Sequence, residues 1–580
     1  GARYRYDALG RCVEVACAGG FYSGSLHYDP ANRTTAVTDS QGRITRYRYN
    51  AQKLVTHVTN PLGETTETEY DAHERVVAEI DPLGRCRAYA YDEQGRLSAI
   101  TAPDGTCTRF EYDGDRRHPA RVIDPLGQVW RYRYNFAGQP VSVESPQGRI
   151  TRYRYHATGQ LAEQLTPAGR TLRWEYDAAQ RLAAYVDGAG QRWRYEYDAL
   201  DRCVTRVDPQ GHRTLLEYDE RDRCVACVDA DGNRVSVDYD SEHNPVTWRD
   251  GEGRQSHAAY GPFDLCTVQT DAGGAAYRFE YDRDYARLVA AVNPIGQRYE
   301  YRLDAAGRVI EEIDYAGGRT RYQYDPAGQL IAKTNALGQT IRYEYDALGR
   351  CLLEQADGEA PIRYEYDALG RLVRASNGDC ELGFAYDPDG RLIEERQHDA
   401  RIGYRYDGDG LCTQRLLYLP GQDQPHVTHF AFDGNGLLER LTLPQTSPLH
   451  IQRDGRGLPL TVHSHQGFWL QQRYTPGGLL AEQQAGYGRG ERLPQWPAGV
   501  PLDVGLQRHY RYDRSGLPRL MTDRDVGERR YRYDVAARVV EVQGTYGAER
   551  FDYGPLGELR AMSRQGGAGL PERWRLSHHA

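Results

Sequence analysis

The chain has 580 residues, of which 39% are hydrophobic and 27% are charged, and its mean hydropathy is -0.76. This length excludes a peptide, a single small module and a minimal disulfide scaffold. The polar composition is unusual for a packed globular core, but the 45 tyrosines argue against disorder, because disordered segments are poor in aromatic residues. We therefore expect an ordered protein with little dry interior per residue.

The net charge is -9, and lysine occurs only at Lys53 and Lys333, so arginine supplies nearly all of the 73 basic residues. Acidic and basic residues are interspersed without a basic block, which favours salt bridges between strands over nucleic-acid binding. No apolar run reaches the roughly 18 residues of a membrane-spanning helix, and residues 1–6 lack a signal-peptide pattern. We expect a soluble chain and, because it starts within a repeat, a fragment or processed piece of a longer protein.

A repeat of 21 residues runs along the whole chain. The pair Tyr-Asp recurs at Tyr70, Tyr91 and Tyr112, and later copies keep the same step. The segment 42–49 returns unchanged as 148–155. Such self-similarity identifies an array of small structural units, of which we count about 26 when degenerate copies are included.

Each unit is predicted to be a β-hairpin. Its first strand, as in 45–49, alternates so that tyrosines share one face and arginines the other. A turn such as 346–349 follows and ends in glycine, which accepts positive φ without penalty. The second strand, as in 96–100, is shorter and more apolar. It closes with a turn such as 81–84, Asp-Pro-Leu-Gly, in which proline presets φ.

The predicted fold is all-β, with about 52 strands in tandem hairpins along a continuous ribbon across residues 1–580. Open twisted sheets rarely exceed about 10 strands without curling or splitting. We therefore expect this ribbon to wind into a hollow, cocoon-like or barrel-like shell, although the sequence leaves open which face is interior. Arginine and glutamate are expected to pair between adjacent strands rather than between equivalent strands two apart.

The recurring signature of the array is Tyr-Asp-x-x-Gly-Arg, and its role is predicted to be structural. Residues that carry it are Tyr70, Asp71, Tyr91, Asp92, Gly95, Arg96, Tyr197, Asp198, Tyr345, Asp346, Gly349, Arg350, Tyr366, Asp367, Gly370 and Arg371.

The cysteines and the aspartate-proline turns resemble functional motifs, but their positions follow the repeat. The Asp-Pro-Leu-Gly copies at Asp81 and Asp124 fall on the repeat spacing, so a turn explains them. Cys224 and Cys227 would point to opposite faces of one strand, which disfavours a metal site. The 11 cysteines show no framework spacing, which suits folding in a reducing cytosol.

The spacing becomes irregular between residues 407 and 512, with an insertion at about 477–509. The insertion is predicted to be a surface loop, and the alternative is a loop that enters the cavity or contacts a neighbouring protein through Tyr487 and Trp496. His463 and His465 would share one face of a strand and could bind a metal, but no third ligand is evident in the sequence.

No catalytic, cofactor-binding or metal-binding residue is assigned. The sequence contains no serine elbow, phosphate-binding loop or His-Glu-x-x-His motif. We therefore predict a protein that is not an enzyme and uses no cofactor.

The segment 366–372, Tyr-Asp-Ala-Leu-Gly-Arg-Leu, and its copy at 386–392 resemble the YD repeat of Rhs proteins, of the C component of insecticidal toxin complexes and of the teneurin shell. The resemblance covers essentially the whole chain, and bacterial Rhs is the closest in pattern. It implies a hollow β-cocoon that sequesters a toxic C-terminal domain. The family's aspartyl self-cleavage element, near an Arg-Tyr-Tyr-Asp-Pro segment, has no counterpart in this chain.

The resemblance also implies partners and a route. The expected partners are a C-terminal toxin domain of the same parent as cargo, an N-terminal plug that binds a secretion spike, and a chaperone. It implies synthesis in a bacterial cytoplasm, then delivery to a target cell, commonly by type VI secretion in competition between bacteria. The alternative is a teneurin-like or wall-associated surface module that binds a glycan or a receptor.

Overall fold

The computed structural model describes residues 2–488, 503–566 and 572–575. In these residues the regular structure consists of β-strands that belong to one antiparallel sheet, together with two short 3-10 segments, η1 (Ala18–Gly20) and η2 (Pro262–Asp264). The prediction of an all-β chain of tandem hairpins is confirmed. The chain divides into two compact units.

The first unit comprises residues 1–148, 260–268 and 277–401. Its earlier strands are β1 (Arg3–Tyr6), β2 (Cys12–Ala16), β3 (Gly24–Asp29), β4 (Thr34–Asp39), β5 (Ile44–Tyr49), β6 (Val55–Thr59), β7 (Thr65–Tyr70), β8 (Val76–Ile80), β9 (Cys86–Tyr91), β10 (Leu97–Thr101), β11 (Cys107–Tyr112), β12 (Pro119–Ile123), β13 (Val129–Tyr134) and β14 (Pro140–Glu144). Its later strands are β27 (Ala276–Tyr281), β28 (Leu288–Val292), β29 (Arg298–Leu303), β30 (Val309–Ile313), β31 (Arg319–Tyr324), β32 (Leu330–Thr334), β33 (Thr340–Tyr345), β34 (Cys351–Ala356), β35 (Ile362–Tyr366), β36 (Leu372–Ser376), β37 (Glu381–Tyr386) and β38 (Leu392–Gln397).

The second unit comprises residues 149–259, 269–276 and 402–580. Its earlier strands are β15 (Ile150–Tyr155), β16 (Leu161–Leu165), β17 (Thr171–Tyr176), β18 (Leu182–Val186), β19 (Arg192–Tyr197), β20 (Cys203–Val207), β21 (Arg213–Tyr218), β22 (Cys224–Val228), β23 (Arg234–Tyr239), β24 (Pro245–Arg249) and β25 (Gln255–Tyr260). Its later strands are β40 (Cys412–Tyr418), β41 (His426–Phe432), β42 (Leu438–Thr442), β43 (Leu449–Arg453), β44 (Pro459–Ser464), β45 (Phe468–Tyr474), β46 (Leu480–Tyr487), β47 (Asp503–Tyr512), β48 (Pro518–Asp523), β49 (Gly527–Tyr533), β50 (Val539–Gly544), β51 (Gly547–Tyr553), β52 (Leu559–Gly566) and β53 (Glu572–Arg575). The strands at the division of the chain are β26 (Cys266–Thr270) and β39 (Ala400–Tyr406), and β25 and β27 each have one end residue in the other unit.

Within each unit consecutive strands pair in antiparallel register, as the hairpin repeat predicts. In β19 the burial alternates strictly, with the arginines and Glu196 exposed and the tyrosines half-buried. The register shifts by a bulge between Glu196 and Tyr197, so that Tyr197 faces Cys203 of β20. The same bulge recurs before the last tyrosine of other first strands, and it increases the local twist of the ribbon.

The buried core of the sheet consists mainly of small side chains in the middle of the second strands. Among the described residues no large side chain is fully buried, because the wall is a single layer with two outer faces. Most of the buried hydrophobic residues are alanines; the full set is Ala78, Ala162, Ala184, Val207, Ala226, Ala290, Ala332, Leu416, Trp469 and Ala561. This arrangement accounts for the low mean hydropathy.

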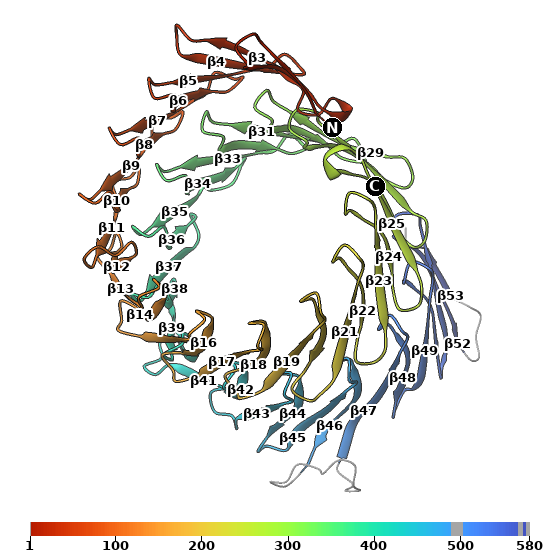
Figure 1. Cartoon of the computed structure of the whole chain (residues 1–580). Helices are drawn as coiled ribbons and strands as arrows, with labels where there is room; N and C mark the ends of the chain where they lie inside the picture. Colours follow the sequence, from red (N-terminus) through yellow and green to blue (C-terminus); the bar gives the residue numbers. More distant parts are fainter. Residues whose placement is uncertain (1, 489–502, 567–571, 576–580) are drawn as a thin grey trace. The chain divides into compact units, whose positions relative to one another are not determined.

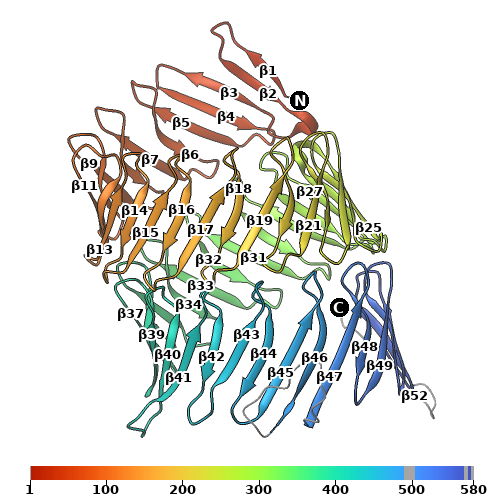
Figure 2. The same ribbon diagram turned by 60° about the horizontal axis from the view of Figure 1, so that its bottom comes forward.

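Each unit contains two stretches of ribbon, far apart in sequence, that run beside each other. In the first unit the arc β7–β13 follows the arc β33–β37 (Figure 1). In the second unit the row β16–β21 runs along the row β42–β47, with the turns of one row facing the turns of the other (Figure 2). Hydrogen bonds between these turns, described below, join the two stretches of each unit.

Candidate functional site

The signature residues form one lock that ties each hairpin to the next. Asp198 accepts a hydrogen bond from Arg202 Nε at 2.7 Å, and a second Arg202 nitrogen lies 2.7 Å from the same carboxylate. The Arg202 guanidinium lies over the ring of Tyr218 in the following repeat, 5.2 Å from the ring centre. The hydroxyl of Tyr218 donates to the carbonyl of Cys203 at 2.8 Å. A charged pair and a cation–π contact therefore fix the position of each tyrosine.

The predicted signature residues all occupy this lock. Arg75 lies over Tyr91, Arg96 over Tyr112, Arg350 over Tyr366 and Arg371 over Tyr386, at 4.3–5.1 Å from the ring centres. The hydroxyls of Tyr70, Tyr91, Tyr197, Tyr345 and Tyr366 donate to carbonyls 15 residues earlier. Asp71, Asp92, Asp198, Asp346 and Asp367 pair with the arginine four residues on, and Gly95, Gly349 and Gly370 have positive φ.

The lock sets the protonation of its aspartates. Hydrogen bonds from Arg75 lower the pKa of Asp71 to about 2, and those from Arg223 do the same for Asp219. The carboxylates therefore stay ionised well into the acid range.

A seam joins the two stretches of the first unit through turns at opposite edges of the ribbon. Asp389, in the turn between β37 and β38, accepts hydrogen bonds from the Ser145 hydroxyl at 2.8 Å and the Gln147 backbone N–H at 3.1 Å. Further along the same edge, Arg308 donates to Glu64 at 3.1 Å. Turns within hairpins of the later strands thus bind the linking turns of the earlier strands, which are the turns that join one hairpin to the next, such as 145–148.

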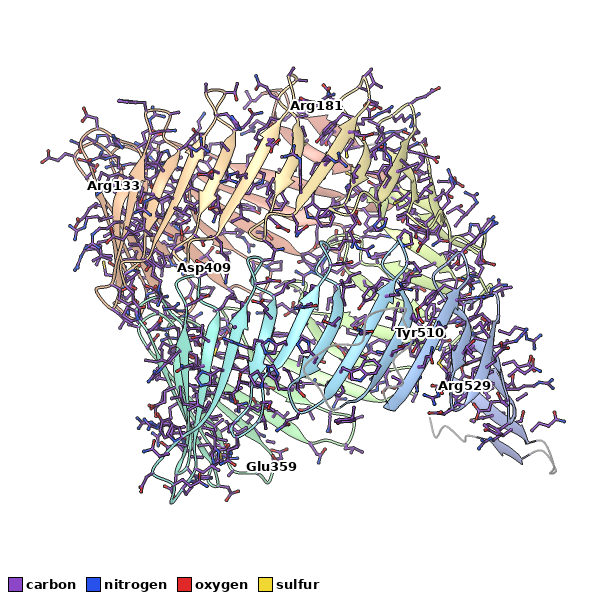
Figure 3. All side chains as sticks on the ribbon, turned by 90° about the horizontal axis from the view of Figure 1, so that it is seen from below. Arg133, Arg181, Glu359, Asp409, Tyr510 and Arg529 are labelled. Atoms are coloured by element: carbon purple, nitrogen blue, oxygen red, sulfur yellow. The ribbon has the colours of Figure 1, made fainter. Side chains whose placement is uncertain are left out.

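The second unit contains the same kind of seam. Asp409 accepts from the Thr166 hydroxyl and from the Ala168 backbone N–H, both at 2.8 Å, and it lies 3.0 Å from Arg170. Figure 3 shows Asp409 at the tip of its hairpin, facing the turns of the earlier strands, whereas Arg181 lies at the other edge of those strands. The Asp409 side chain is only 11% exposed.

The chemistry of the seam follows from what the linking turns lack. In a regular turn Asp81 accepts from the backbone N–H of Leu83 at 2.9 Å, which satisfies the turn internally. The turn that begins at Ser145 has a hydroxyl in place of this carboxylate, and Asp389 supplies the missing acceptor from the other stretch. The Ser145 side chain is buried, so a charged acceptor for its hydroxyl stabilises the contact, and the two turns are complementary.

The spacing of the seam stays near 244 residues up to Thr475 and lengthens to 262–267 residues at the contacts of Glu252. Ser145 and Asp389 are 244 residues apart, and so are Asp231 and Thr475, in which the aspartate lies on the earlier stretch. Gly188 and Gly434 approach so closely that a Cβ on either would overlap the carbonyl oxygen of the other. Backbone contact and side-chain hydrogen bonds thus specify one register of the two stretches.

One face of the sheet carries most of the ionic pairs. In four cases an arginine reaches a glutamate two strands away: Arg192–Glu175, Arg213–Glu196, Arg234–Glu217 and Arg298–Glu280, at 2.5–2.7 Å. The glutamate of each bridge stands opposite a small residue of the intervening strand, and these residues are Ala184, Thr205, Ala226 and Ala290. The expectation of pairing between adjacent strands rather than between strands two apart is wrong for these four bridges, because a small central side chain leaves space for the bridge.

Where the intervening strand carries glutamate instead, the pairing is between adjacent strands. Glu163 of β16 lies 3.1 Å from Arg154 and 3.0 Å from Arg173. Arg374 of β36 reverses the charges and binds Glu365 and Glu381, and its hydrogen bonds lower the pKa of Glu381. This charged face is therefore cross-linked along much of its length.

The charged face is hollowed in each unit. In the second unit a hollow of about 1040 Å³ is lined on this face by Arg473, Glu482, His509, Thr522 and Arg530, among others. In the first unit a hollow of about 710 Å³ is lined by residues that include Arg374, Glu381, Glu394, Arg396 and His398. Both linings also contain apolar residues, such as Leu520 and Phe384, so a bound surface would meet arginine and carboxylate groups beside apolar side chains.

The structure also shows where the other residues considered in the sequence analysis lie: the aspartate-proline turns, the cysteines and the candidate contact residues. Asp81 and Asp124 each begin a hydrogen-bonded turn, as their spacing predicts. Cys224 and Cys227 lie on β22, and all 11 cysteines are free thiols. Tyr487 ends β46 with its side chain 68% exposed, and its ring packs on Phe468. Trp496 lies outside the described residues.

The sequence analysis did not identify a third histidine, His450, beside His463 and His465. His450 of β43 stands opposite His463 of β44 in the strand register, and their rings stack at 5.3 Å. The rings stack and do not converge, and among the residues that the structure describes no group of three ligands could hold a metal ion. The pairing of β43 with β44 would have identified His450, but predicting that pairing requires knowledge of the strand register.

The described part of the chain has no helix long and apolar enough to cross a membrane.

Two family models match this chain. The teneurin YD-shell model matches residues 25–171 and 352–485, and the RHS repeat model matches residues 155–190, 176–213 and 324–360. The chain belongs to the Rhs/YD-repeat family. In this family's terms the Asp–Arg–Tyr lock is the YD repeat, and the seam joins successive stretches of the YD-repeat ribbon.

Similar proteins include two from Dickeya dadantii (strain 3937). The probable deoxyribonucleases RhsB and RhsA are 53% and 44% identical to this YD-repeat chain over 55 residues. Those residues are 10% of this chain and 4% of each relative. The crystal structure of TcdB2-TccC3 is 15% identical with a TM-score of 0.47, and the match covers 96% of this chain and 31% of that chain. The chain thus spans a small part of these longer proteins.

Proposed function

We propose that this chain forms part of the wall of a container that encloses a toxic C-terminal domain of the same parent polypeptide. The seam is the observation that carries the proposal. A ribbon whose two edges bind each other at a spacing near 244 residues, and at 262–267 residues at Glu252, makes a continuous wall, because each added stretch binds the edge of the previous one. A module that only displayed a binding face would not need complementary edges.

Membership of the Rhs/YD-repeat family supports the same proposal. Two relatives are named as probable deoxyribonucleases, although this chain matches only 4% of their length. We assign such an activity to a cargo domain elsewhere in a parent protein and give this chain no catalytic role. Residues 1–580 then act as one shell segment, and Tyr487, at the end of β46, and Trp496 are the residues that contact cargo or a neighbouring component.

We further propose the route that the resemblance implies. The shell assembles in a bacterial cytoplasm, with or without a chaperone, and receives its cargo there. An N-terminal plug engages a secretion spike, and the particle is delivered to a target cell by type VI secretion in competition between bacteria. The free thiols are compatible with assembly in a reducing compartment.

Limited proteolysis of the intact parent protein tests the enclosure. The C-terminal domain is expected to resist a protease at concentrations that degrade the same domain expressed alone. Asp409→Ala, which opens the seam, should shorten the lifetime of the enclosed domain, while Glu242→Ala on an exposed turn should not. Digestion of the domain at equal rates with and without the shell would overturn the proposal, and specific glycan binding by the wall would favour a recognition module.

A further inference from the structure

Three histidines gather on the charged face of the second unit. His450 and His463 stack at 5.3 Å with 19° between the ring planes, and His465 meets His450 edge-on at 5.8 Å. They lie on β43, on β44 and in the turn that follows β44. No ion pair with a carboxylate holds any of the three among the described residues, whereas His509 lies 3.2 Å from Glu482.

The centre of this cluster has no partner for an added proton. His463 stands between His450 on one side and Trp469 of β45 on the other. Its Nδ1 is buried and makes no hydrogen bond, and the same is true of the Trp469 indole nitrogen. A proton on His463 Nδ1 would therefore form a buried N–H without an acceptor, next to a second imidazole.

The surrounding strands do not offer a compensating negative charge. On β42 the residue opposite His450 is Arg440, and Glu439 is exposed at the bulge of that strand. On β45 the charged residue of this face is Arg473, which pairs with Glu482 of β46. Burial and the two neighbouring imidazoles lower the pKa of His463. Acidification thus adds positive charge to a place that already contains arginine.

We propose that His450, His463 and His465 form a proton-sensitive latch, which holds the hairpins β43–β45 closed at neutral pH and lets them open in mild acid. The latch goes beyond the proposed enclosure, since it concerns local opening of the wall and not its contents. It does not rest on a bound metal, because the rings stack and do not converge on a common point.

The direction of the pH effect follows from linkage. The open hairpins bind protons with the ordinary histidine pKa of about 6.5, whereas the closed ones resist protonation at His463. Stability of the closed form is therefore fully present above pH 6.5 or so and is lost as the pH falls below it. A histidine that stays neutral in the closed form contributes about a tenfold shift towards opening at pH 5.5.

Hydrogen exchange of the full chain at pH 7.5 and 5.5, corrected for intrinsic exchange rates and with a chelator present, tests the latch. Amides in 449–474 should show about tenfold less protection at pH 5.5. The segment 319–345 is the internal control, because it forms the same kind of hairpins without histidine and should show no change. Equal behaviour of the two segments would overturn the proposal.

Two variants separate a latch from general acid sensitivity. Replacing all three histidines with glutamine should abolish the pH effect in 449–474, and His463→Gln alone should remove most of it. If either variant folds poorly, the imidazole titrations of the unmodified chain, followed by NMR, provide the second measurement. A His463 that titrates at 6.5 or above in the folded chain would contradict the latch, and so would a pH effect that survives the triple variant.

Discussion

Asp409→Ala is predicted to open the seam of the second unit without disturbing the hairpins themselves. The substitution removes the acceptor of the Thr166 hydroxyl and of the Ala168 N–H, and it separates Arg170 from one of its two carboxylates. Arg170 keeps Asp407 at 3.3 Å. The hairpin turn that contains Asp409 is closed by Asp407, so its local structure should persist.

The size of the effect follows from the two lost hydrogen bonds. A hydrogen bond to a charged group contributes about 1.5–3 kcal/mol, and removal of one partner of a buried pair costs about 3–5 kcal/mol. Because Arg170 retains a carboxylate, we take a value near the lower end, about 3 kcal/mol. Asp409→Asn should cost less, since its amide oxygen can still accept from Ala168.

Native-state hydrogen exchange measures this loss where it occurs. Local opening of the turn 166–169 should become more frequent by about a hundredfold, since about 1.4 kcal/mol corresponds to a factor of ten. Glu242→Ala is the matched control, because Glu242 is the exposed third residue of a turn on the earlier stretch of the same unit. Unchanged exchange at Ala168 in Asp409→Ala would refute the assignment of Asp409 as the acceptor that this turn lacks.

Three further substitutions or conditions test other parts of the wall. Ala290→Leu should destabilise β27–β29 by about 1–3 kcal/mol, because the residue has no exposed surface and stands opposite Glu280 of an arginine–glutamate bridge; local exchange measures the loss, and no change would contradict the packing. Gly188→Ala should part the two backbones at Gly434 and raise protease sensitivity there, whereas Gly505→Ala should be tolerated; equal sensitivity would argue against close contact. Below pH 4 the lock of Asp219 should weaken as the pH falls towards 2, because its lowered pKa stabilises the fold fully only above the unfolded carboxyl's pKa of about 3.9, and this stabilisation is lost as the folded carboxyl becomes protonated; pepsin digestion over this range should then be less pH-dependent in Asp219→Asn.

The local structure of the wall could be predicted because it is encoded within each 21-residue repeat. The alternation in 45–49 and the Asp-Ala-Leu-Gly turn at 346–349 specify strands, faces and turns from residues that are neighbours in sequence. The cation–π contact of Arg202 with Tyr218 spans a single repeat, so it too was within reach of sequence reasoning. Only its geometry required the structure.

The long-range features could not be predicted, because they depend on how the ribbon curves. Ser145 and Asp389 meet across 244 residues, and nothing in either turn specifies that distance. The sequence does indicate that the turn at Ser145 needs an acceptor from elsewhere, since serine replaces the usual carboxylate, but it does not identify the residue that supplies that acceptor. His450 was missed for a related reason, since its contact with His463 depends on the register of a hairpin with irregular spacing.

The enclosure itself is tested most directly by determining the structure of the full parent protein by electron cryomicroscopy. The account predicts density for the C-terminal domain inside the wall, against the charged face that includes Arg374 and Arg473. It also predicts that the Asp389–Ser145 and Asp409–Thr166 contacts are present in that particle. A C-terminal domain that lies outside the wall in solvent, with the hollows empty, would contradict the account.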